Sequence, residues 1–176
     1  MSGLVRLLRA EWRLLAFGFL MTAGSSFGQT FFIALSGAAI RADLELSHGV
    51  FGALYSTATL ASAGVLLFSG SLIDRLPLQR YVLLTALALA GGCALLAGAG
   101  DAFALLLALF LLRQAGQGLM MLAGTTSVVR YIEDDRGKAS AVAGSGYTTA
   151  EALLPVFAVA VTTALGWRVA WYGWAL

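Results

Sequence analysis

The sequence predicts an all-α fold: a polytopic bundle of membrane-spanning helices. Five apolar stretches are each long enough to cross the ~30 Å hydrocarbon core of a bilayer, which takes about 20 helical residues. These stretches are continuously apolar. The strands of a membrane β-barrel instead alternate polar and apolar residues over segments of about ten residues. Hydrophobic residues make up 60% and charged residues 11% of the chain, and the mean hydropathy is +0.87. Soluble domains carry about 25% charged residues, so this composition excludes a large soluble domain.

Charged residues and the single histidine delimit the predicted spans. The first three spans contain no charge, whereas the fourth contains Arg113 and the fifth contains Glu151. A sixth span starts after Arg168 and is incomplete, so we expect the chain, one N-terminal transmembrane domain over residues 1–176, to be a fragment or truncated product. The predicted spans are 14–40, 49–73, 81–100, 102–129 and 139–166, with the start of the sixth at 168–176.

Basic residues at the ends of these spans indicate the orientation of the chain. With the N-terminus in the cytoplasm, the inner segments hold most of the lysine and arginine, as the positive-inside rule describes. These residues form no basic patch, so neither the net charge of +2 nor the pI near 9.0 indicates a nucleic-acid partner. The inner group is Arg6, Arg9, Arg13, Arg75, Arg80, Arg130, Arg136 and Lys138, and the outer group is Arg41 and Arg168.

Small residues indicate how the spans pack. Gly24 and Gly28 form a GxxxG pattern in the first span, and Gly116 and Gly118 lie together in the fourth. Glycine permits the close backbone approach that helices use in lipid, so we expect these faces to be packing surfaces. The alternative is that these glycines have no specific role, because glycine is common in membrane helices.

The loop after the second span carries a motif that suggests a family. Residues 70–80 read GSLIDRLPLQR, in which Gly70 is followed four residues later by Asp74 and Arg75. This pattern resembles the signature loop of the major facilitator superfamily, although Pro77 stands in place of the family's loop glycine. We expect Asp74 to accept hydrogen bonds from basic groups on neighbouring cytoplasmic segments. The alternative is an ordinary solvated turn.

Further likenesses to the same superfamily extend the resemblance over nearly the whole chain. Residues 112–118, LRQAGQG, resemble its arginine-containing fourth helix, residues 166–168, GWR, resemble the segment before its sixth helix, and residues 136–138, RGK, fit the start of its fifth. The resemblance implies the N-terminal six-helix half of a twelve-helix transporter in a bacterial inner membrane, built from inverted three-helix repeats. It also implies alternating access around a central site, and a partner that is either the missing C-terminal half or a second copy.

The two charges inside the spans are the candidate functional residues. Arg113 and Glu151 each lie roughly 20 Å from the nearer charged flank, which places both near the middle of the membrane. We expect Arg113 to attract an anionic substrate and Glu151 to carry a coupling proton, with polar groups added by Gln29, Tyr55 and Tyr147. The alternatives are a structural ion pair between Arg113 and Glu151, and a simple interhelical hydrogen bond for Gln29.

These residues predict a secondary active transporter of a small solute, a proton-coupled symporter for an organic anion. A structural or receptor-like helical membrane protein is the alternative. An intramembrane enzyme is more distant, because His48 lies in an outer loop with no nucleophile or metal cluster at membrane depth. Cys93 is the single cysteine, so we expect no disulfide, metal or cofactor. The aromatic residues near the end of the chain are expected to form an interfacial belt, namely Trp167, Trp171, Tyr172 and Trp174.

Overall fold

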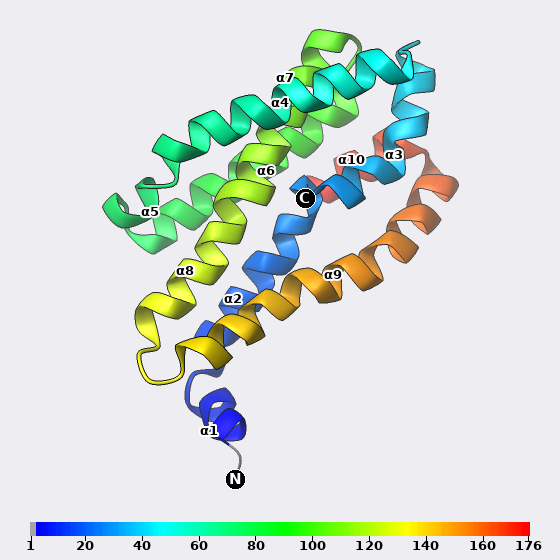
Figure 1. The fold of residues 1–176 in the computed structure, drawn as a ribbon. Helices are drawn as coiled ribbons and strands as arrows, with labels where there is room; N and C mark the ends of the chain where they lie inside the picture. Colours follow the sequence, from blue (N-terminus) through cyan, green and yellow to red (C-terminus); the bar gives the residue numbers. More distant parts are fainter. Residues whose placement is uncertain (1–2) are drawn as a thin grey trace.

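The computed structural model describes residues 3–176, and every regular element in that range is helical, which confirms the predicted fold class (Figure 1). The helices run back and forth through one bundle and are joined by short connections. They are α1 (Gly3–Ala10), α2 (Trp12–Gly24), η1 (Ser25–Gly28), α3 (Thr30–Asp43), α4 (His48–Ser69), α5 (Leu72–Arg75), α6 (Leu78–Gly98), α7 (Ala102–Leu112), η2 (Arg113–Met120), α8 (Met121–Tyr131), α9 (Arg136–Leu165) and α10 (Trp167–Trp174).

Four helical segments are long and apolar enough to cross a membrane by length and composition. They are His48–Arg75, Leu78–Gly98, Ala102–Tyr131 and Arg136–Leu165. The first predicted span differs, because α2 ends at Gly24, a short 3-10 turn follows, and Gln29 adopts an extended backbone (φ −84°, ψ 154°) before α3 begins. The stretch 14–40 is therefore an interrupted helix and not the continuous one that the sequence predicted.

Local sequence explains where several helices begin and end. The Ser47 hydroxyl accepts a hydrogen bond from the Val50 backbone N–H at 3.2 Å and caps α4, and the Asp101 carboxylate caps α7 in the same way, through Ala104 at 2.8 Å. Gly166 ends α9 with φ +81°, a backbone conformation that glycine adopts without strain. These capping residues separate successive spans, and the chain reverses direction at each of them.

The fourth span also departs from a regular α-helix. Residues Arg113–Met120 form a π-helix, η2, between α7 and α8. Such wide turns are rare and are frequently found at functional sites. η1 of the first span packs against η2, so the two irregular segments meet inside the bundle.

Glycines allow this close crossing. A Cβ atom added to Gly28 would clash with the Leu112 carbonyl oxygen and lie 2.7 Å from the Gly116 Cα atom. Gly24 faces the Met120 sulfur and Gly118 faces Leu66 of α4, at 3.1 and 3.0 Å from an added Cβ. All four predicted packing glycines therefore lie at contacts between helices, and the Gly28 and Gly116 pair is the tightest because backbone meets backbone.

The end of the bundle at which α10 begins is held by residues of that helix. Arg168 donates to the Asp43 carboxylate at 2.9 Å and to the Ala97 carbonyl at 2.7 Å, which ties the ends of three spans together. Trp171 is fully buried and donates its indole N–H to the Ser36 hydroxyl at 2.9 Å. The prediction of an interfacial belt is therefore wrong for Trp171, which is a core residue.

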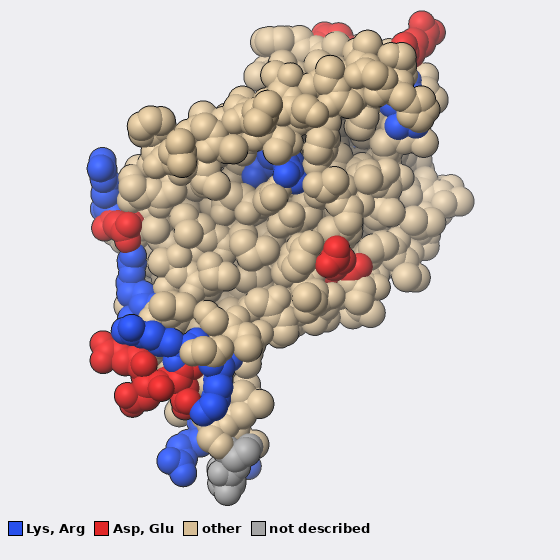
Figure 2. Space-filling model, viewed as in Figure 1, with Lys and Arg blue, Asp and Glu red and all other residues tan. Residues whose placement is uncertain are grey.

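One face of the bundle is open. Figure 2 shows a hollow between α4 and α9, with charged side chains gathered at the two ends of the molecule and one isolated basic and one isolated acidic patch between them. In the sequence, Arg113 and Glu151 are the two charges that interrupt the apolar stretches. α4 and α9 are also the least buried of the four long helices. The hollowed face is the surface on which we place the candidate site.

Candidate functional site

Arg113 is the centre of the candidate site and is held by the interrupted first span. It begins η2, and only 7% of its surface is exposed. Its Nη1 atom donates to the Gly28 carbonyl at 3.3 Å and to the Thr30 hydroxyl at 3.1 Å, on either side of the break at Gln29. The break leaves carbonyl groups without a hydrogen-bond donor from the helix, and the guanidinium of Arg113 donates a hydrogen bond to one of them, that of Gly28.

Tyr55 of α4 completes the surroundings of Arg113. The guanidinium carbon lies 5.4 Å from the centre of the Tyr55 ring, within the range of a cation–π interaction. The Tyr55 hydroxyl donates to the same Thr30 hydroxyl oxygen at 2.9 Å. Tyr55, Thr30 and Arg113 thus form one polar cluster that joins the first, second and fourth spans.

The charge of Arg113 has no acidic counterpart in residues 3–176 of the structure. The ion pairs found there join Arg130 to Asp74, Lys138 to Asp135 and Arg168 to Asp43. The Nε atom of Arg113 is buried and has no hydrogen-bond partner within the same range. A buried guanidinium is costly unless it is paired or faces a polar cavity, so this arrangement can accept an anion.

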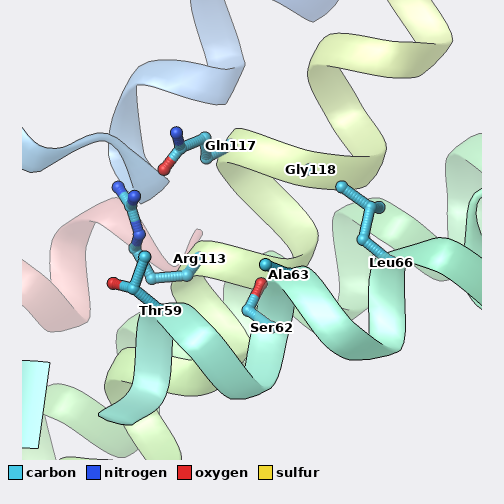
Figure 3. Close-up of a pocket in the computed structure, with 7 residues that line it drawn as sticks. All are labelled: Thr59, Ser62, Ala63, Leu66, Arg113, Gln117 and Gly118. Carbon is cyan, nitrogen blue, oxygen red and sulfur yellow. The ribbon is translucent and has the colours of Figure 1, made fainter. Parts of the chain in front are cut away.

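A pocket of about 180 Å³ lies against Arg113, between α4 and η2 (Figure 3). Figure 3 shows the polar ends of Arg113 and Gln117 on the same side of the pocket, with Thr59 and Ser62 rising from α4. Gln117 is exposed there although its neighbours in η2 are buried. The pocket combines a cation with hydroxyl and amide groups, which are the groups that bind a small polar anion. Its lining residues are Thr59, Ser62, Ala63, Leu66, Arg113, Gln117 and Gly118.

Gln114 supports the pocket from behind and was not among the predicted site residues. Its amide nitrogen donates to the Ser69 hydroxyl at 2.7 Å, and its carbonyl oxygen accepts from the Ser62 hydroxyl at 3.1 Å. Ser62 and Ser69 are seven residues apart, so they lie on one face of α4. That spacing of two serines, together with a glutamine beside Arg113, is the sequence signal that could have found this bridge between the second and fourth spans.

The remaining predicted residues lie on or near this face without touching Arg113. Gln29 is buried and forms the break in the first span, and its side chain makes no hydrogen bond within the described range. Tyr147 of α9 is half-buried and packs edge-on against Phe31, with ring centres 6.2 Å apart. Glu151 is exposed one turn further along α9. It does not line the pocket and forms no ion pair with Arg113 between residues 3 and 176, so the structural ion pair is not found.

The loop after α4 contacts the fourth span as predicted for Asp74. The Asp74 carboxylate accepts a hydrogen bond from Arg130 in the last turn of α8, and Arg130 also donates to the Ile73 carbonyl at 3.3 Å. Gly70 follows the end of α4, and Arg75 is exposed. Asp74 and Arg130 therefore join neighbouring ends of the second and fourth spans.

Comparison with known proteins gives one match. A family model described as the Major Facilitator Superfamily matches residues 16–176. No curated protein and no solved structure gives a match. The matched range begins inside α2 and includes η1, η2, Arg113 and the loop that carries Asp74.

Proposed function

This chain belongs to the Major Facilitator Superfamily, and on that premise we propose that it moves a small organic anion together with a proton by alternating access. Members of this superfamily are membrane transporters and not enzymes, so membership itself establishes a membrane transport protein. The anion, the proton and the symport direction are our proposal, as are a bacterial inner-membrane location and a cytoplasmic N-terminus. A missing C-terminal half or a second copy is the proposed partner across the open face.

The single observation that carries the proposal is the burial of Arg113 without a counter-charge. Two neutral acceptors, the Gly28 carbonyl and the Thr30 hydroxyl, satisfy one of its nitrogen atoms, and its Nε atom has no partner in the described part of the chain. A carboxylate in the adjacent pocket would add the missing charge and a strong, charge-assisted hydrogen bond. A neutral solute would leave the guanidinium uncompensated, so the geometry favours an anion.

Gln117 and the hydroxyl groups of α4 are proposed to orient that anion. Gln117 reaches the pocket from the same helix as Arg113, and Thr59 and Ser62 face it from α4. Because α4 and η2 both line the pocket, a bound anion would draw the second and fourth spans together. Differential binding of this kind can shift a transporter between its two access states.

Glu151 is proposed as the proton carrier. It is exposed on α9, and the structure gives it no ion pair within residues 3–176, so no fixed cation opposes its protonation. Figure 2 shows one isolated acidic patch on the same hollowed face as an isolated basic patch. Protonation removes a charge from this face. The free-energy cost of burying the face in the occluded state of the transporter is then lower.

The alternative to transport at this site is a purely structural role, in which Arg113 only caps the interrupted first span. A proton-flux assay separates the two. We would reconstitute the full-length protein into liposomes that contain a pH-sensitive dye, add a panel of mono- and dicarboxylates, and record proton entry. We expect at least one carboxylate to drive proton entry with the natural protein and none to do so with Arg113→Gln.

Arg136→Gln is the matched control, because Arg136 is exposed, does not line the Arg113 pocket and forms no ion pair in the described part of the chain. This variant removes one arginine without touching the pocket, so it should transport like the natural protein. If proton entry persists in Arg113→Gln at the natural rate, the anion is not bound at Arg113 and the proposal fails.

A further inference from the structure

The proposed transport mechanism makes no use of α1, the short helix that precedes the first span. Figure 1 places it at one end of the bundle, beside the connection between α8 and α9. Glu11 lies at the bend between α1 and α2, with φ −116° and ψ 24°. Because of this bend, α1 does not continue the first span. The contacts of its side chains must therefore be considered separately from those of α2.

One side of α1 packs on the bundle. Leu7 is 6% exposed and belongs to an apolar cluster with Leu15 of α2, Val128 of α8 and Ala139 of α9. This contact fixes α1 against the ends of three spans. It uses a single side chain of the helix, so most of the apolar surface of α1 stays outside the contact.

The rest of the apolar side of α1 is uncovered. At about 100° of rotation per residue, Leu4, Leu8 and Val5 fall within one arc beside Leu7, and Trp12 follows the bend at Glu11. Their exposed fractions are 42%, 40%, 38% and 59%, respectively. Three exposed apolar side chains on one arc of α1, with an exposed tryptophan just after the bend, are costly in water. They are typical of a helix that lies in the interfacial layer of a membrane.

The opposite side of α1 is basic. Arg6 and Arg9 are exposed and form no ion pair in the described range, although Arg6 shares a pocket of about 340 Å³ with the acidic run at residues 133–135. Arg13 follows in α2 and lies over the Trp12 ring at 5.5 Å. Arginines that flank an apolar arc are placed to reach lipid phosphates while the arc enters the acyl region.

We propose that α1 seats on the adjacent leaflet of an anionic membrane. Leu7 holds the helix to the bundle, Leu4, Leu8 and Trp12 enter the lipid, and Arg6 and Arg9 contact the phosphates of anionic headgroups. The basis for anionic lipid is charge complementarity, since the exposed side of α1 carries arginine and no acidic residue between Gly3 and Ala10. This inference depends on the membrane location of the chain and not on its substrate.

The test measures the depth of two labelled positions in the full-length protein. A nitroxide label is attached to Leu8→Cys, on the apolar arc, or to Ala10→Cys, on the far side, in a Cys93→Ala background that removes the single native cysteine. Each protein is placed in nanodiscs of phosphatidylcholine with or without phosphatidylglycerol. Collision with oxygen reports lipid exposure, and collision with a water-soluble nickel chelate reports water exposure.

We expect the Leu8 label to be immersed in discs that contain phosphatidylglycerol and the Ala10 label to stay in water. Arg6→Gln and Arg9→Gln should each lower the ratio of seated to free helix about five-fold. Arg80→Gln, an exposed arginine at the start of α6, should not change it.

Three results would overturn the proposal. Equal nickel accessibility at the two labels would show that α1 stays in water. Immersion that is the same in both lipids and insensitive to the arginines would exclude anionic headgroups as the partner. A Leu8 label shielded from both reagents would show protein contact, such as a second copy of the chain.

Discussion

Gly28→Ala perturbs the crossing on which the candidate site is built. Gly28 of η1 meets η2 with no side chain between them, and its carbonyl oxygen accepts the hydrogen bond from Arg113. An added Cβ would lie 2.7 Å from the Gly116 Cα atom and 2.8 Å from the Gln117 nitrogen, and it would clash with the Leu112 carbonyl oxygen. All three neighbours are backbone atoms, which cannot turn aside as a flexible side chain can.

The structure sets the size of the effect. Carbon atoms pack best at about 3.5–4.0 Å, so η1 and η2 must separate by roughly 1 Å to admit the methyl group. Overpacking of this kind costs about 1–3 kcal/mol, and we expect the upper end because backbone must move. At about 2–4 °C per kcal/mol for a chain of this size, the melting temperature should fall by roughly 6–12 °C.

Cys93 provides the assay, because it is the single cysteine and only 1% of its surface is exposed. A dye that fluoresces on reaction with thiols reports unfolding as this side chain becomes accessible on heating. Gly144→Ala is the matched control, since an added Cβ on this glycine of α9 has no atom within 4 Å. That variant should melt at or slightly above the natural temperature, because alanine favours a helix by up to about 1 kcal/mol over glycine. Equal melting of the two variants would refute the close crossing.

Three further outcomes follow from the contacts at the site. Asp74→Asn removes an exposed ion pair with Arg130, so it should cost less than about 1 kcal/mol of stability while slowing substrate turnover in liposomes. Turnover at the rate of the natural protein would show that Asp74 is only a residue of the turn. Gln114→Leu should cost about 1–2 kcal/mol in the same melting assay, because it leaves the buried Ser62 hydroxyl without its acceptor and removes the hydrogen bond to Ser69, whereas Gln117→Leu should leave stability unchanged; equal effects would contradict the bridge. The stability effects of Arg113→Gln and Glu151→Gln should add within about 0.5 kcal/mol in the double variant, and rescue of one by the other would reveal an ion pair that the structure does not contain.

The sequence was sufficient to predict most of the fold, because long apolar runs in a bilayer have few alternatives to helix. It did not predict the break in the first span. Ser25, Gly28 and Gln29 carry no strong helix-stopping signal in an apolar run, and the break lies where Gly116, in another part of the chain, approaches Gly28. The local sequence does not indicate a tertiary contact of this kind.

Counting residues gives an expected depth for the two charges inside the spans, but it does not give the direction in which their side chains point. Counting residues along a helix places Arg113 and Glu151 at similar depths, and this supported the alternative of an ion pair. The direction in which each side chain points depends on rotation about the helix axis. In the structure Arg113 points to the break at Gln29 and to Tyr55, whereas Glu151 stays exposed on α9.

Trp171 shows the same limit on a smaller scale. Clustered tryptophans near the end of a span are typical of the membrane interface, which is why the sequence predicted a belt. The structure buries Trp171 against Phe32, with ring centres 5.5 Å apart, and pairs its indole N–H with Ser36. Residue type indicates the environment that tryptophan occupies on average. The packing of α10 on α3 determines the environment of Trp171 in this chain.

The central claim is that Arg113 binds the anion and Glu151 carries the proton, and one measurement tests it most directly. Uptake of a radiolabelled carboxylate that the natural protein transports is recorded in liposomes, with and without an imposed pH gradient. Arg113→Gln should lose uptake under both conditions, because the anion has no binding charge. Glu151→Gln should still exchange the anion across the membrane but no longer accumulate it in response to the gradient. Gradient-driven accumulation by Glu151→Gln at the natural level, or exchange by Arg113→Gln, would contradict the account.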